Sequence, residues 1–253
     1  MPAAPPGVIG VLGGIGPLAT VHFLERVVRL TDAARDQDHV DLVVLQHAGV
    51  PDRTDFLLGR STDDPGPVLV EDVRRLERLG VSAVVLTCNT ADAFRPQLVD
   101  AVGVPVVSIV ERTVMAAAAR LARPGGAASG RVGVLATDGT VAVGVYRDEL
   151  GRHGLEQVLP SPGAQAQVTE VIYGQVKRGL PSDGGALRTV IDDLRAAGAE
   201  IVVLGCTELS VAAGEHSLLA DPAVVDSVES LAADTVLRAG RRLRVTAGGA
   251  AGP

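Results

Sequence analysis

The chain contains Val84-Val85-Leu86-Thr87-Cys88-Asn89-Thr90-Ala91 and, 118 residues later, Val202-Val203-Leu204-Gly205-Cys206-Thr207-Glu208-Leu209. In both stretches an apolar run typical of a buried parallel strand leads into a cysteine. Residues with hydroxyl, amide or carboxylate side chains follow each cysteine and favour the start of a helix. Both cysteines are therefore predicted at strand-to-helix junctions.

The similarity between the halves extends beyond the two cysteines. At the same displacement, the segment from Leu76 to Glu111 matches the segment from Leu194 to Glu229 at ten positions in order. The starts of the halves match at a displacement of 123, where Gly10-Val11-Leu12 corresponds to Gly133-Val134-Leu135 and Phe23 to Tyr146. Chance pairing among many Val and Leu residues is the alternative, but the ordered spacing favours a repeat of two related lobes.

Within each half, short apolar runs alternate with longer segments of helical period, which indicates parallel strands joined by helical crossovers. We therefore predict an α/β protein of two pseudo-symmetric open parallel-sheet lobes, with the active site in the cleft between them. The N-terminal lobe is predicted over 1–112, with 227–245 returning to it, the C-terminal lobe over 113–226, and a disordered tail over 246–253. Ligands of such sheets bind beyond the carboxyl ends of the strands, where both cysteines lie.

The composition restricts the class of partner. The 253 residues carry a formal net charge of -7 without a cluster of Lys or Arg, which argues against nucleic acid or an anionic membrane and favours a small molecule. No basic region precedes the first apolar stretch, and no apolar run approaches the roughly 20 residues needed to cross a bilayer. We therefore expect a cytoplasmic protein.

The cysteines have few structural explanations. Cytosolic thiols stay reduced, so a stabilising disulfide is not expected, and no CxxC pattern predicts a metal site. Two small buried hydrophobes are one alternative. A Cys-His nucleophile is another, but the sequence places none of the five histidines beside a cysteine. A nucleotide site is not favoured, because the loop Gly13-Gly14-Ile15-Gly16-Pro17 lacks the P-loop lysine and the GxGxxG spacing.

Two thiols at equivalent strand ends of facing lobes would lie on opposite sides of a bound substrate. A helix N-terminus favours the thiolate, so one cysteine could remove a proton while the other returns one to the opposite face. A general base contributes roughly 10²–10⁴-fold, whereas enzymes commonly reach at least about 10⁶, so the carbanion must also be stabilised. Free backbone amides after each cysteine could do this. Such an arrangement fits racemisation.

At these residues the sequence resembles the aspartate/glutamate racemase superfamily, and within it the aspartate racemase branch. The resemblance runs from about Val8 to Ala239. Besides the two cysteine motifs, it is carried by Gly13-Gly14-Ile15-Gly16-Pro17-Leu18-Ala19-Thr20, Pro51-Asp52-Arg53-Thr54, Leu135-Ala136-Thr137-Asp138-Gly139-Thr140, and Ile172-Tyr173 with Lys177.

The resemblance implies a pair of catalytic cysteines, no pyridoxal phosphate or other cofactor, an amino-acid substrate and a homodimer. By position in the motifs, Arg53 would bind a substrate carboxylate and Lys177 would reach into the cleft. The α-carboxylate would be held by Asn89, Thr90 and Thr207. The full substrate-binding set predicted in this way is Gly14, Arg53, Asn89, Thr90, Asp92, Thr137, Lys177, Thr207 and Glu208.

Asp92 departs from the family pattern, which usually continues Asn-Thr-Ala-His after the first cysteine. If Asp92 points into the pocket, its charge would repel an acidic side chain and favour a neutral or cationic substrate. If it points outward, it would only favour the helix N-terminus. We take the outward orientation and expect aspartate or glutamate as substrate.

Two other functions remain open at this point. Superfamily relatives that act on other substrates include decarboxylases and cis-trans isomerases. Reversible proton exchange uses both cysteines, whereas a decarboxylase needs only one proton donor. A non-catalytic ligand-binding descendant of the fold is the alternative from another class, and the intact Cys88 and Cys206 argue against it.

Overall fold

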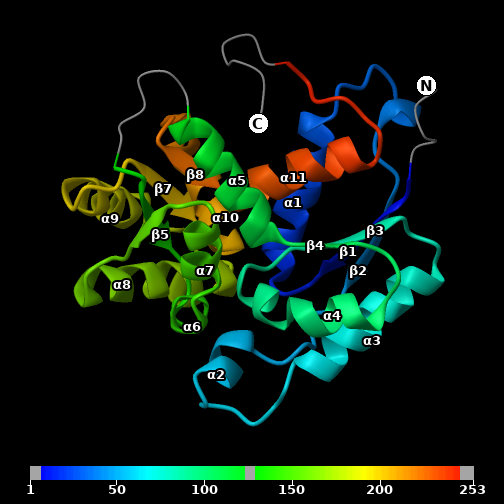
Figure 1. The fold of residues 1–253 in the computed structure, drawn as a ribbon, viewed down its shortest axis with the longest axis horizontal. Helices are drawn as coiled ribbons and strands as arrows, with labels where there is room; N and C mark the ends of the chain where they lie inside the picture. Colours follow the sequence, from blue (N-terminus) through cyan, green and yellow to red (C-terminus); the bar gives the residue numbers. More distant parts are fainter. Residues whose placement is uncertain (1–6, 123–128, 246–253) are drawn as a thin grey trace.

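The computed structural model describes residues 7–122 and 129–245, which contain two four-stranded parallel sheets. Their strand orders are β2-β1-β3-β4 and β6-β5-β7-β8, so each half of the chain forms its own sheet (Figure 1). The strands are β1 Ile9–Gly13, β2 Leu42–Gln46, β3 Ala83–Leu86, β4 Val106–Val107, β5 Arg131–Leu135, β6 Glu156–Val158, β7 Ile201–Leu204 and β8 Val224–Asp226. The predicted α/β class with two parallel-sheet lobes is confirmed. The predicted tail over 246–253 lies outside the described residues.

The registers of the two sheets reproduce the sequence repeat. Val84 of β3 lies opposite Val106 of β4, and Val202 of β7 lies opposite Val224 of β8, each pair displaced from the other by 118. Likewise β1 pairs with β3 as β5 pairs with β7 at the displacements read from the sequence. The correspondence between the halves is therefore structural.

Helices connect the strands and cover the sheets. The α-helices are α1 Pro17–Leu30, α2 Arg53–Leu57, α3 Gly66–Arg78, α4 Arg95–Ala101, α5 Ile109–Leu121, α6 Asp138–Val143, α7 Val145–Arg152, α8 Pro162–Thr169, α9 Gly184–Ala196, α10 Thr207–Glu215 and α11 Ser227–Arg238. Shorter helical segments are η1 Asp36–Asp38, η2 Thr90–Phe94, η3 Glu170–Gln175, η4 Val176–Arg178 and η5 Leu218–Ala220, of which η3 is a π-helix. Within the described ranges, no helix combines the length and apolar character that a membrane span requires.

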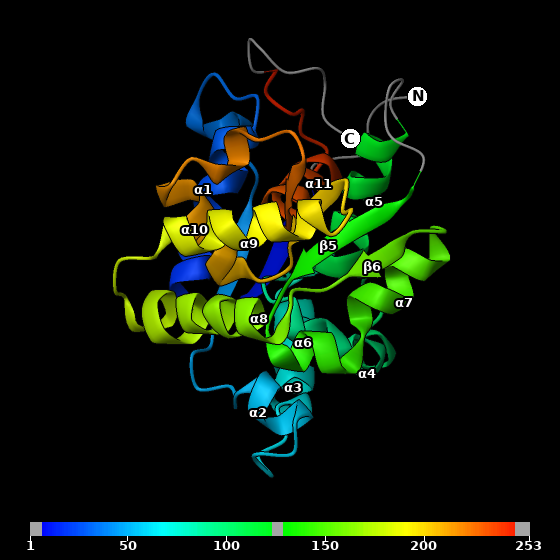
Figure 2. The ribbon, with the colours of Figure 1, turned by 90° about the vertical axis from the view of Figure 1, so that its left-hand side faces the viewer.

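Two helices cross between the lobes. Helix α5 follows β4 of the first sheet but packs against α7, β7 and β8 of the second lobe. Helix α11 follows β8 of the second sheet but packs against α1 of the first lobe, and it also contacts α5 (Figures 1 and 2). The predicted lobe boundary at residue 112 therefore falls inside a helix that follows one sheet and covers the other.

Both crossing helices begin with the same cap. The hydroxyl of Ser108 accepts the Glu111 N–H at the start of α5, and the carboxylate of Asp226 accepts the Glu229 N–H at the start of α11. A polar cap followed three residues later by Glu is the capping-box pattern, which fixes where a helix begins. The two boxes are again displaced by 118.

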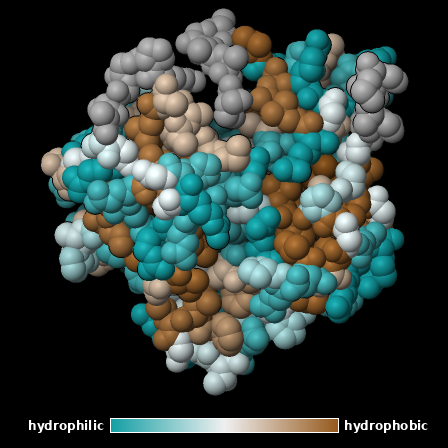
Figure 3. All heavy atoms as spheres, viewed as in Figure 1, coloured by the Kyte–Doolittle hydropathy of each residue, from teal (hydrophilic) through white to brown (hydrophobic). Residues whose placement is uncertain are grey.

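One apolar core extends across the two lobes. It contains Val85 of β3, Val203 of β7 and Leu231 of α11, all fully buried. The surface differs: in Figure 3, hydrophilic residues gather across the middle of the face where α5, α7 and α4 meet. The lobes are thus joined by burial of apolar side chains beneath a polar surface.

Leu231 tests this shared core against a matched leucine of the same helix. Replacing the fully buried Leu231 with Ala should lower the free energy of unfolding by about 2–5 kcal/mol, because a cavity remains between the lobes. Leu237→Ala on the exposed side of α11 should change it by only about 0.5 kcal/mol. Chemical denaturation of both variants measures the difference, and equal effects would contradict a core shared through α11.

Candidate active site

A small cavity lies between the lobes at the carboxyl ends of the central strands. Residues from both halves line it: Ile15, Arg53, Thr54, Cys88, Asn89, Thr90, Thr137, Tyr173, Lys177, Cys206, Thr207 and Glu208. Cys88 follows β3 and Cys206 follows β7, and both are buried and free. The two thiols that the sequence placed at equivalent strand ends therefore line one cavity.

Cys206 is held as a thiol. It is the N-cap residue of α10, and its Sγ donates to Glu208 Oε2 at 3.1 Å. Burial raises the pKa of the Cys206 thiol well above its ordinary value, the Glu208 carboxylate raises it further, and Lys177 opposes the rise. The arrangement makes Cys206 a proton donor.

Lys177 balances the charge of Glu208. Its Nζ lies 3.3 Å from Glu208 Oε1 and 5.1 Å from the centre of the Tyr173 ring. Burial alone would lower the pKa of Lys177, but Glu208 and the two cysteines raise it above its ordinary value. Lys177 is therefore a fixed ammonium at the wall of the cavity.

Arg53 lies beside the other cysteine. Burial opposes its charge, but the neighbouring Cys88 and Asp52 raise the pKa of Arg53 above its ordinary value. Its Nη1 donates to the carbonyls of Val50 and Pro51, whereas its buried Nε has no partner. Arg53 and Cys88 both line the cavity.

Three threonines of the cavity lining, Thr54, Thr90 and Thr137, form a hydroxyl network with Thr140 across the lobes. Thr90 and Thr137 lie 3.0 Å apart, Thr90 and Thr140 lie 2.8 Å apart, and Thr54 donates to Thr137 at 3.2 Å. The approach depends on Gly139, where a Cβ would lie 2.8 Å from the Thr54 Cα. The glycine thus lets α2 and α6 meet at the site.

Asn89 is largely occupied by protein partners. Tyr146 of α7 donates its hydroxyl to Asn89 Oδ1 at 2.6 Å, and Asn89 Nδ2 donates to Ser227 Oγ at 3.1 Å. One amide hydrogen and the backbone remain available for a ligand. These two hydrogen bonds hold Asn89, the residue after Cys88, against α7 and α11 of the second half of the chain.

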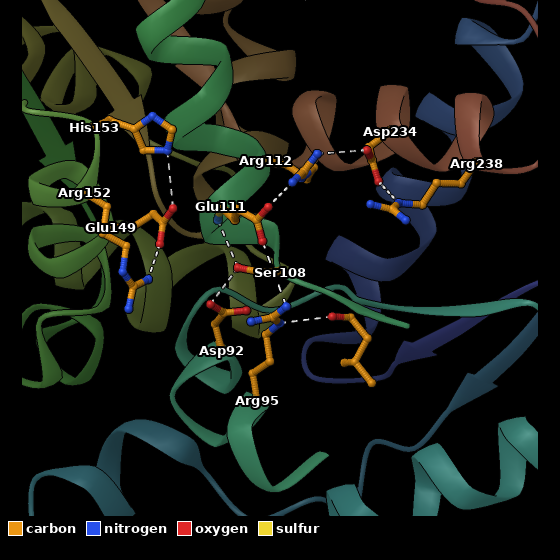
Figure 4. Close-up of polar contacts among 11 residues, drawn as sticks. Asp92, Arg95, Ser108, Glu111, Arg112, Glu149, Arg152, His153, Asp234 and Arg238 are labelled. Atoms are coloured by element: carbon orange, nitrogen blue, oxygen red, sulfur yellow. Dashed lines mark hydrogen bonds and ion pairs between the residues drawn. The ribbon is translucent and has the colours of Figure 1, made fainter. Parts of the chain in front are cut away.

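Two predicted site residues are not among those that line the cavity. The N–H of Gly14 donates to Thr20 Oγ1 at 2.9 Å, and with φ at +86° a Cβ there would lie 2.4 Å from His47 N, so Gly14 shapes the loop that presents Ile15. Asp92 points neither into the cavity nor to solvent. Its Oδ2 accepts from Ser108 at 2.8 Å and its Oδ1 is buried without a partner (Figure 4).

Ile15, Thr54 and Tyr173 line the cavity but were not among the predicted site residues. All three lie in motifs quoted for the family resemblance, directly beside or near residues that were predicted. The signal in the sequence was their position close to residues that the motifs assigned to the site. Tyr173 lies in the π-helical segment η3, a distortion that is frequent at functional sites, and sequence does not indicate it.

The cavity offers no set of ligands for a metal. Among residues 7–122 and 129–245, no group of three or more His, Cys, Asp or Glu side chains is placed to hold a metal ion. The chemistry of the lining is instead that of two thiols, two cations, one carboxylate and several hydroxyls.

Comparison with known proteins gives a consistent result. The family model described as Asp/Glu/hydantoin racemase matches residues 12–235. The broad specificity amino-acid racemase RacX of Bacillus subtilis is 26% identical over 234 residues, which cover 90% of this chain and 96% of RacX. A glutamate racemase of Deinococcus radiodurans is 35% identical over 195 residues, covering 73% of this chain and 63% of that protein. The structure of Picrophilus torridus aspartate racemase superposes with a TM-score of 0.79 and 28% identity, covering 94% of this chain and 96% of that one.

The protonation of Cys206 can be tested through Glu208. Glu208→Gln removes a negative charge beside the sulfur, so the pKa of Cys206 should fall and its alkylation by iodoacetamide at pH 8 should become faster, by about tenfold for each unit of pKa. The rate at Cys206, followed by peptide mass spectrometry from pH 6 to 10, should rise at lower pH in the variant. Glu215→Gln, on the same helix, is the control. An unchanged profile in Glu208→Gln would contradict the electrostatic role of Glu208.

Proposed function

Because the chain belongs to the Asp/Glu/hydantoin racemase family, we propose that this amino-acid racemase acts on aspartate or glutamate by two-base proton transfer between Cys88 and Cys206. The resemblance inferred from the motifs is confirmed by the comparisons. The observation that carries the proposed mechanism is that both thiols, from equivalent positions of the two lobes, line one cavity. The homodimer implied by the resemblance and the cytoplasmic location expected from the sequence stay predictions.

In the proposed reaction the two sulfurs have different roles. Cys88 lies beside the Arg53 guanidinium, whereas Cys206 donates its proton to Glu208. The Cys88 thiolate takes the α-proton from one face of the substrate and becomes a thiol. Cys206 gives its proton to the opposite face and becomes a thiolate. The product leaves with inverted configuration, and the same steps in reverse convert the other enantiomer.

The intermediate needs donors for its developing negative charge. Helix α10 begins without a side-chain cap, and Thr207 and Glu208 of its first turn line the cavity, so we assign the N–H groups of this turn as the donors. Such donors stabilise an enediolate more than the ground-state carboxylate. This supplies the part of the rate enhancement that a thiolate base alone does not.

The charge of the lining favours an acidic substrate. Glu208 is neutralised by Lys177, which leaves the Arg53 guanidinium as the cation without a carboxylate partner in the cavity. The side-chain carboxylate of an acidic amino acid can bind the Arg53 guanidinium, whereas a neutral amino acid has no such group for it. Asp92 does not alter this balance from within the cavity.

The proposed reaction uses no pyridoxal phosphate. A Schiff base would have to form on Lys177, the only lysine of the chain. Its ammonium is paired with Glu208 and its pKa is raised, so the free amine that attacks an aldehyde is disfavoured. The two thiols then have to carry both proton transfers.

Each cysteine is tested by substitution. Cys88→Ser and Cys206→Ser should each lower racemisation of aspartate by at least about 10²-fold, because each removes an acid-base group, while circular dichroism stays unchanged. The assay follows α-proton exchange by NMR in deuterated water and the product enantiomer by chiral chromatography. Loss in only one variant would contradict the two-base mechanism. Exchange with carbon dioxide release would favour a decarboxylase, and silence with acidic, neutral and basic amino acids would favour a binding protein.

Arg53 is tested through the Michaelis constant. Arg53→Ala should raise KM for aspartate by about 10–100-fold, because charge-assisted hydrogen bonds to a carboxylate are lost. Arg60→Ala is the matched control, since that side chain is exposed and outside the cavity lining. Initial rates with aspartate and alanine measure both variants. If Arg53→Ala changed neither KM nor the preference between them, Arg53 would not set substrate charge.

A further inference from the structure

Asp92 connects two elements behind the first cysteine. It lies in η2, four residues after Cys88, and its Oδ2 accepts the Ser108 hydroxyl at 2.8 Å. The same hydroxyl accepts the Glu111 N–H that caps α5 (Figure 4). The pair therefore joins the turn after Cys88 to the start of a helix that packs on the other lobe.

The second lobe contains the same two positions with the residue types exchanged. Displaced by 118, Asp92 corresponds to Ser210 and Ser108 corresponds to Asp226. Ser210 lies on α10, four residues after Cys206, and Asp226 caps α11. Ser210 Oγ and Asp226 Oδ2 are both buried without a hydrogen-bond partner, so the second lobe holds the two residue types without the hydrogen bond that joins Asp92 to Ser108. The acid and the hydroxyl thus stand at the same two places in both lobes.

The surroundings of both carboxyls disfavour their charged form. Burial raises the pKa of Asp92 and of Asp226 to about 6 in each case. A carboxyl removed from water is unfavourable unless hydrogen bonds compensate. Neither residue lines the cavity, so substrate contact does not explain either one. What the two share is their place in the repeat, where one position lies four residues after a cysteine and the other caps the crossing helix.

We propose that Asp92 and Ser108 form an acid–hydroxyl pair that the second lobe holds with the residue types exchanged, as Ser210 and Asp226 at the equivalent positions. In this arrangement Asp92 is a positioning residue. It acts through Ser108 to hold the turn that presents Cys88, and it does not select the charge of the substrate. The consequence for catalysis rests on the proposed racemase function, because an error of about 1 Å in placing a reacting group can cost about 10²-fold in rate.

The exchange itself provides the experiment. Ser108→Asp places a second carboxylate against Asp92 and should lower kcat for aspartate by about tenfold or more with little change in KM, because repulsion displaces the turn. Asp92→Ser should lower kcat less. The double variant Asp92→Ser/Ser108→Asp rebuilds the arrangement of the second lobe and should return kcat to within about threefold of wild type, a large non-additivity.

Milder variants cover the case in which Ser108→Asp does not fold. Asp92→Asn keeps an oxygen that accepts from Ser108 and should retain kcat within about threefold, whereas Ser108→Ala leaves a buried carboxylate without its donor and should lower kcat by about tenfold. Thermal unfolding of every variant separates loss of fold from loss of rate. If Asp92→Asn were as impaired as Ser108→Ala, or if the double variant showed the product of the single losses, the proposal would be overturned.

A readout without turnover separates this proposal from the proposed function. Iodoacetamide alkylation at Cys88 and Cys206 is followed by peptide mass spectrometry in the same variants. Ser108→Asp should change the rate at Cys88 by more than about threefold and leave Cys206 unchanged, and the double variant should restore it. Unchanged Cys88 rates in all variants would overturn the pairing even if the enzyme racemises aspartate. A wild type inactive on every amino acid, with these alkylation rates as expected, would overturn only the proposed function.

A last measurement, of substrate preference, tests whether Asp92 selects the charge of the substrate. The double variant should keep the wild-type ratio of kcat/KM for aspartate to that for alanine. The carboxylate moves from position 92 to position 108, and neither position lines the cavity. A ratio that moved by more than about tenfold, equivalent to about 1.4 kcal/mol, would show that Asp92 acts on the substrate and would overturn the proposal.

Discussion

Helices α5 and α11 pack against each other between the sheets, and each covers apolar surface of the lobe whose sheet it does not follow. Most of the site depends on this crossing of the two helices between the lobes. The turn after Cys88 leads through β4 into α5, and the turn after Cys206 leads through β8 into α11. Because dispersion and burial in a close-packed core resist displacement, the helices fix where the two turns face each other. Asn89 adds directional hydrogen bonds to Tyr146 and Ser227 at the same junction.

A symmetric backbone carries an asymmetric set of side chains. Equivalent positions hold Phe23 and Tyr146, and only the second has the hydroxyl that reaches Asn89. Thr90 of the first lobe corresponds to Glu208 of the second, so one cysteine has hydroxyls nearby and the other a carboxylate. In the proposed mechanism the repeated fold positions two thiols alike, while the unlike neighbours give one the role of base and the other the role of acid.

The repeat made the architecture predictable, because the period of the apolar runs and the displacement of the halves are both written in the sequence. Most of the cavity lining could be inferred from motifs at strand ends, since parallel strands end on the same side of a sheet. The orientation of Asp92 could not. A residue after a buried strand has several directions open to it, and only the tertiary contact with Ser108 selects one. The hydrogen bond from Tyr146 to Asn89 could not be predicted either, because the two residues are far apart in the chain and meet only when α7 packs at the junction.

The ion pair between Glu208 and Lys177 is weak evidence for stability, since desolvation of the buried carboxylate and of the partly buried ammonium offsets much of their attraction. Its place beside Cys206 suggests a different use. When Cys206 has given up its proton in the proposed reaction, a thiolate lies next to the Glu208 carboxylate, and one ammonium faces two negative charges. At short range and reduced dielectric such repulsion is worth several kcal/mol, so this form of the enzyme is the less stable one. Lys177 lowers the pKa of the Cys206 thiol while Glu208 raises it. In the proposed reaction each protonation state accepts one enantiomer, so the opposing effects of Lys177 and Glu208 set how far apart in energy the two states lie.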